Sequence, residues 1–171
     1  CKITIPGLYL IEITASAKSW WQNTTGRRTL LKKDSLTLTL NSKEIVPLPK
    51  KRKLLANDLW NGNVLQGNSQ TIYIVANLLR GDASVDFIVH GKPFLEEVNV
   101  YSLSDAEVTL QDLSPSKRDR IPWLTFIMSE GAILSSISLS ASANVLGDDD
   151  QDLQLIFDGK KESNHKNTTH K

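Results

Sequence analysis

The sequence predicts an all-β protein: an antiparallel, jelly-roll-like β-sandwich in one full copy, followed by a partial second copy. Three observations carry this prediction. Apolar and polar residues alternate over several short segments, which is the pattern of half-buried strands. Two blocks of sequence recur in the same order along the chain. No window shows the apolar stripe at spacings of three and four residues that an amphipathic helix requires.

The recurring blocks indicate a tandem repeat of one β-domain. Residues 9–17 (YLIEITASA) match residues 135–143 (SSISLSASA), and residues 36–43 (LTLTLNSK) match residues 153–160 (LQLIFDGK). We therefore expect the division 1–103 for the first copy, 104–160 for a partial second copy, and 161–171 for a disordered or truncated tail. An incomplete second copy is expected to expose a sheet edge.

The strands are assigned from the alternation, in chain order. In residues 9–17 the odd positions are apolar, and in residues 36–40 leucine alternates with threonine. Further strands are expected over residues 71–76, 84–89, 97–103, 107–110, 123–128, 135–143 and 153–157. Residues 81–82 are predicted to form a tight turn, residues 54–60 at most one helical turn, and residues 114–122 a linker bracketed by prolines.

Composition places the chain among ordinary soluble globular proteins and limits its partners. It has 171 residues, of which 40% are hydrophobic and 23% charged, with a net charge of +1. The balanced charge predicts no nucleic-acid partner. No apolar run approaches the roughly 20 residues that cross a bilayer, so we expect no membrane span. Cys1 is the only cysteine, which leaves no internal disulfide and no thiolate metal cluster.

Catalytic motifs are missing from the sequence, so we expect no enzyme, no cofactor and no metal site. There is no G-x-S-x-G, no H-E-x-x-H and no phosphate-binding glycine loop. Of three histidines, only His90 lies outside the polar tail. Glu96 and Glu97 are neighbours and would point to opposite faces of a strand, unlike a glycosidase pair. The acidic residues of 148–152 could bind calcium, but a solvated loop is favoured, as it is for the basic run 50–53.

A ligand site is suggested by tryptophans beside polar residues in predicted loops. An exposed indole stacks on the apolar CH face of a sugar ring, while nearby amides and carboxylates bind its hydroxyls. The alternative for each tryptophan is packing, because one of two adjacent tryptophans on a strand should face the core. The candidates are Trp20, Trp21, Trp60, Asn57, Asp58, Asn61 and Asn63.

The order of short motifs in residues 6–101 resembles that of galactose-binding-like, jelly-roll carbohydrate-binding modules. Such modules open with Gly-x-Tyr and an alternating strand, then carry a strand that ends in a turn, a tryptophan region, a leucine-to-glycine hairpin and a closing strand. The matching segments here are Gly7-Leu8-Tyr9, Leu36–Leu40 with Asn41-Ser42, Trp60-Asn61-Gly62-Asn63, Leu78-Leu79-Arg80-Gly81 and Val98-Asn99-Val100-Tyr101. Asn41 is followed by Ser42 where the family often has glycine.

The resemblance implies a non-catalytic carbohydrate-binding or adhesion module of a larger secreted or cell-surface protein, of bacterial type. Its partners would be a glycan and other domains of the same polypeptide, and repeated modules would raise the apparent affinity by linking sites. The alternative function is structural, with the copies acting as spacers that position a catalytic domain such as a peptidase or glycan hydrolase.

Overall fold

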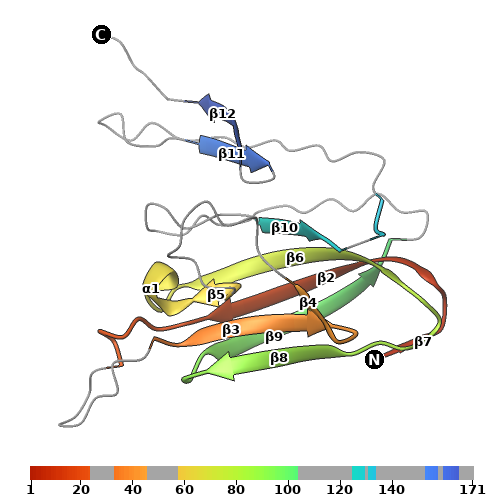
Figure 1. Ribbon diagram of the computed structural model, residues 1–171, viewed down its shortest axis with the longest axis horizontal. Coiled ribbons are helices and arrows are strands. Elements are labelled where there is room, and N and C mark those ends of the chain that lie inside the picture. Colours follow the sequence, from red (N-terminus) through yellow and green to blue (C-terminus); the bar gives the residue numbers. More distant parts are fainter. Residues whose placement is uncertain are drawn as a thin grey trace. The chain divides into compact units, whose positions relative to one another are not determined.

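The computed structural model describes residues 1–23, 33–45, 58–103, 125–129 and 131–133, and the backbone alone for 153–157 and 160–165 (Figure 1). The described residues form strands and one short helix, which confirms the all-β class. The chain divides into two compact units, Cys1–Pro47 with Leu54–Ile133, and Leu48–Lys53 with Leu134–Lys171. Within the described residues, no helix has the length and apolar character to cross a membrane.

The first sheet of the first unit has four strands in the order β10-β6-β2-β9. They are β10 (Thr125–Met128), β6 (Ser69–Leu78), β2 (Gly7–Ser16) and β9 (Phe94–Ser102). β2 pairs antiparallel with both β6 and β9, whereas β10 pairs parallel with β6. The predicted antiparallel pairing is therefore wrong for this one pair. The strand next to β6 comes from a distant part of the chain, and its direction is not set by a hairpin turn.

The second sheet is built around β3 (Ser35–Leu40), which is paired along its whole length with β8 (Val85–His90). β4 (Lys43–Ile45) and β5 (Trp60–Asn61) pair with the two ends of β3. Asn41 and Ser42 connect β3 to β4 with φ angles of 49° and 65°. Positive φ at both positions is typical of a type I′ hairpin turn, so this turn forms here with serine where glycine is usual.

Two short elements complete the first unit. β1 (Lys2–Ile3) pairs with β7 (Gly81–Asp82), so the residues predicted as a tight turn instead form a two-residue strand. The helix α1 covers Gly62–Leu65. Of the residues 54–60 where at most one helical turn was predicted, 54–57 lie outside the described residues and Trp60 lies in β5. Trp60 pairs with Leu36 of β3.

One hydrophobic cluster contains the inward-facing side chains of both four-stranded sheets. The apolar positions of β2 and β3 are buried in this cluster as expected. The residues concerned are Ile11, Ile13, Ala15, Leu36, Leu38 and Leu40. In β3 two of the intervening polar residues, Ser35 and Thr37, are buried as well. Trp60 is the largest fully buried side chain of the cluster.

The opposite face of the first sheet carries a polar cluster centred on Glu12. The carboxylate of Glu12 accepts hydrogen bonds from the Tyr73 hydroxyl at 2.9 Å and from the Tyr101 hydroxyl and the Asn99 amide at 3.1 Å. Burial, with the hydrogen bond to Glu12 and its negative charge, raises the pKa of Tyr73 well above the ordinary tyrosine range. The hydrogen bond to Glu12 also raises the pKa of Tyr101.

These tyrosines make stability sensitive to alkaline pH. Unfolded tyrosine loses its proton near pH 10, whereas folded Tyr73 keeps it. The folded state then binds more protons, so the contribution of Tyr73 is complete below about pH 10 and is lost as the pH rises above it. We expect Tyr73→Phe to flatten the alkaline fall in unfolding free energy, measured by urea denaturation in steps above pH 10. Identical slopes for the variant and the parent chain would contradict this.

The second unit contains a hairpin of β11 (Leu153–Phe157) and β12 (Lys160–His165). β11 confirms the strand predicted there. β12 includes residues 161–165, the first part of the segment that was expected to be a disordered or truncated tail. β11 and β12 pair Phe157 with Lys160, as β3 and β4 pair Leu40 with Lys43, and these are the positions aligned by the proposed repeat. The repeat and its boundary at residues 103 and 104 stay predictions.

The predicted strands over residues 107–110 and 135–143 and the predicted linker 114–122 lie outside the described residues. The same holds for the acidic residues of 148–152 and the basic run 50–53, neither of which the described structure includes.

Candidate ligand-binding site

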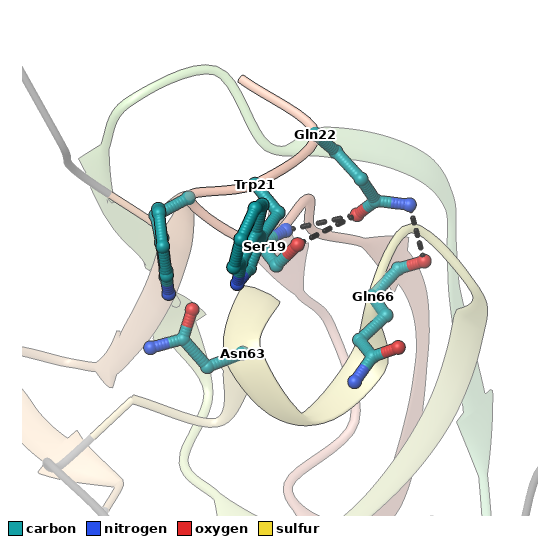
Figure 2. Close-up of a pocket in the computed structure, with 6 residues that line it drawn as sticks. Ser19, Trp21, Gln22, Asn63 and Gln66 are labelled. Atoms are coloured by element: carbon teal, nitrogen blue, oxygen red, sulfur yellow. Dashed lines mark hydrogen bonds between the residues drawn. The ribbon is translucent and has the colours of Figure 1, made fainter. Parts of the chain in front are cut away.

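An open pocket of about 600 Å³ lies where the segment after β2 meets the short helix α1 (Figure 2). Its described lining is uncharged and combines two indoles with three amides and a hydroxyl. The lining residues are Ser19, Trp20, Trp21, Gln22, Asn63 and Gln66. Three of the predicted ligand residues, Trp20, Trp21 and Asn63, are therefore brought together.

Trp20 and Trp21 stack on each other, with ring centroids 4.3 Å apart and an angle of 30° between the ring planes. Trp21 is 70% exposed, and Trp20 is half-buried. The expectation that one of two adjacent tryptophans faces the core applies to a strand, but β2 ends at Ser16 and these residues lie in a turn. The turn places both indoles on the same side, where they present an aromatic surface at the pocket.

The turn that carries the indoles is held by hydrogen bonds of Ser19 and Gln22. The backbone N–H groups of Gln22 and Asn23 donate to the Ser19 carbonyl at 3.1 and 3.2 Å. The Gln22 side chain accepts from the Ser19 backbone N–H at 3.0 Å and donates to the Gln66 carbonyl at 2.7 Å. Figure 2 shows this side chain bridging the turn and the end of α1, so Gln22 fixes the pocket wall.

Helix α1 is set in place by backbone contacts that require glycine at its start. The Asn61 side chain caps the helix by accepting from the Asn63 N–H at 3.0 Å. The Gly62 N–H donates to the Asp34 carbonyl at 2.9 Å. A Cβ on Gly62 would lie 1.9 Å from the Lys18 carbonyl oxygen, so no other residue fits without a backbone shift. This close approach brings the exposed Asn63 side chain to the pocket.

Asp34 connects three segments that support the pocket. It is 2% exposed, and one carboxylate oxygen accepts from the Asn23 amide at 2.9 Å and from the Lys92 N–H at 2.8 Å. The other oxygen accepts from the Lys18 N–H at 3.3 Å. A buried carboxylate that accepts several hydrogen bonds holds the segments that donate them in place.

The prediction of a ligand platform is wrong for Trp60, whose side chain is 0% exposed. Its indole N–H donates to the Gln70 carbonyl at 2.8 Å inside the core. This is the packing alternative, and it follows from the pairing of β5 with β3, which turns the indole between the sheets. A side chain without exposed surface offers no ring face to a sugar.

The remaining predicted ligand residues have structural partners or fall outside the described chain. Asn61 is buried and serves as the helix cap described above, which corrects its assignment as a ligand residue. Asp58 forms an ion pair with Lys33, with 2.6 Å between carboxylate oxygen and ammonium nitrogen. Asn57 lies outside the described residues.

Sequence reasoning missed Ser19, Gln22 and Gln66 as pocket residues. Gln22 carried a weak signal, since it follows the two tryptophans in a polar segment. Gln66 carried none: its place depends on a left-handed backbone conformation, with φ of 49°, at the end of α1. Among the described residues, no group of three or more His, Cys, Asp or Glu side chains is placed to hold a metal ion.

Comparisons with models of known protein families, with curated proteins and with solved structures found no match to this chain.

Proposed function

We propose that this chain is a non-catalytic carbohydrate-binding module, of jelly-roll-like β-sandwich architecture, within a larger secreted or cell-surface protein. The observation that supports this most directly is the stacked Trp20–Trp21 pair beside Asn63 in one open pocket. Tryptophan next to amide side chains is the surface that a sugar ring requires, because the ring offers both an apolar face and hydroxyl groups.

In this mechanism the exposed indole of Trp21 covers the CH face of one sugar ring, and the Asn63 amide donates to and accepts from its hydroxyls. The Gln22 amide is held by Ser19 and Gln66, so it shapes the wall and does not need to reorganise on binding. None of the six described lining residues is charged. We therefore expect neutral oligosaccharides to bind in preference to uronic-acid or sulfated ones.

The experiment is calorimetric titration of the intact chain with neutral cello-, xylo-, manno- and chito-oligosaccharides, with polygalacturonate and heparin fragments as anionic controls. We expect saturable binding of at least one neutral glycan. Trp21→Ala should weaken it at least about tenfold, which corresponds to ~1.4 kcal/mol, because the stacking surface is lost. Calorimetry is preferred for this comparison because Trp21 is itself a fluorophore.

Two further variants make the result specific to the pocket. Asn63→Ala should weaken binding while leaving both indoles in place. Leu79→Ala removes another exposed apolar side chain, outside the pocket, and should leave the affinity unchanged. Failure of every neutral glycan to bind the folded chain would contradict the proposal and favour the structural-spacer hypothesis.

A further inference from the structure

The edge strand β9 exposes apolar side chains along almost its whole length. Five of its nine residues are apolar or aromatic side chains that are between 39% and 66% exposed. They are Phe94, Leu95, Val98, Val100 and Tyr101. Among the described strands, β9 pairs with β2 and with no other, and it ends the order of its sheet (Figure 1).

The register shows that part of this exposed surface belongs to the core side of the sheet. Val98 lies opposite Ile13 and Val100 lies opposite Ile11, and both isoleucines are buried in the hydrophobic cluster. Since side chains alternate across a strand, Val98 and Val100 point to the same face as these isoleucines. The core-facing side of the sheet is therefore incompletely covered at β9.

The second sheet shows the same incomplete covering at β8. Val89 lies opposite the buried Leu36 and so shares its inward face, yet Val89 is 53% exposed. Polar inward residues on an edge strand disfavour its pairing with another chain. β8 and β9 instead carry inward-facing valines that remain accessible to solvent.

The charges of β9 favour one kind of partner strand. Its sequence holds Glu96 and Glu97 and no lysine or arginine, and within the described chain neither glutamate forms an ion pair. Glu97 lies opposite Thr14, on the same outward face as Glu12. Pairing β9 with a second copy about Val98 would place the two Glu97 side chains on diagonal positions of one face, where like charges repel.

We propose that β9 is a docking edge for an extended peptide strand that alternates apolar with basic residues. Backbone hydrogen bonds would add this strand next to β9, with its apolar side chains covering Val98 and Val100. Its lysine or arginine side chains would lie on the outward face beside Glu97 and Glu12. This interaction involves a surface other than the tryptophan pocket and does not depend on sugar binding.

The probe is a nine-residue peptide with blocked ends that alternates valine and lysine, matched to the length of β9. Binding to the intact chain is measured by fluorescence anisotropy at low salt, and the site by hydrogen exchange of backbone amides. We expect saturable binding, with slower exchange concentrated in β9. A peptide N-methylated at alternate residues keeps the charge but cannot pair through its backbone, and it should not bind. A peptide with glutamate in place of lysine should bind at least about tenfold more weakly.

Variants of the chain test the charge pairing. Glu97→Lys should weaken the binding of the lysine peptide about tenfold and strengthen the binding of the glutamate peptide. Glu97→Gln keeps an acceptor for the Asn99 amide, which now donates to Glu97, and should give an intermediate affinity if charge is the cause. Absence of binding, equal binding of the N-methylated peptide, or a dimer through β9 detected by light scattering would each overturn the proposal.

Discussion

Replacing Trp60 with alanine should lower the free energy of unfolding by about 3–5 kcal/mol. The side chain is 0% exposed and belongs to the cluster formed by both four-stranded sheets, so its removal leaves a cavity that the surrounding β-strands cannot fill by small shifts. The variant also removes the indole N–H that donates to the Gln70 carbonyl.

Urea denaturation followed by circular dichroism measures this loss, and Trp60→Phe provides the control. Phenylalanine keeps much of the ring volume but lacks the indole N–H, so its cost should be clearly smaller than that of alanine. A cost below about 1 kcal/mol for Trp60→Ala would mean that the indole is not part of the core. Trp21→Ala, at an exposed site, should change the unfolding free energy by less than about 0.5 kcal/mol.

Replacing Asp34 with alanine should cost about 2–4 kcal/mol and loosen the tryptophan pocket. The change leaves the backbone N–H groups of Lys18 and Lys92 and the amide of Asn23 without their acceptor. These donors belong to three separate segments, so the loss should release the turn that carries Trp20 and Trp21. We expect lower thermal stability together with weaker glycan binding, measured on the same preparation.

Two control variants separate the hydrogen bonds of Asp34 from its charge. Asp34→Asn keeps one acceptor oxygen and should recover part of the stability. Asp82→Ala removes a carboxylate from an exposed position and should cost less than about 0.5 kcal/mol. Equal losses for Asp34→Ala and Asp82→Ala would contradict a connecting role for Asp34.

The agreement between sequence and structure is best where the signal is local. Alternation over residues 9–17 and 36–40 correctly identified β2 and β3 and the buried positions Ile11, Ile13, Leu36 and Leu38. This succeeds because consecutive side chains of a strand point to opposite faces, whatever the strand pairs with. The same reasoning located β6, β8, β9, β10 and β11 with errors of a few residues at their ends.

The candidate site was predicted in part. Tryptophan beside amide residues led to Trp20, Trp21 and Asn63, which share the pocket, but the same signal included Trp60 and Asn61, which are buried. Composition indicates that an aromatic and polar segment exists, but it does not indicate which indole is covered by another sheet. Gln66 lines the pocket because its backbone adopts a left-handed conformation, for which glutamine itself has no preference.

The sequence by itself thus determined the all-β class, the inward and outward positions of the main strands and the presence of an aromatic segment near polar residues. Only the tertiary structure decided that Trp60 fills the core, that Trp20 and Trp21 stack at an open pocket, and that β10 runs parallel to β6. It also decided that β9 is the last of the described strands in its sheet and that its valines are exposed. The physical reason is that alternation depends on neighbouring residues alone, whereas burial and strand order depend on contacts between residues far apart in the chain.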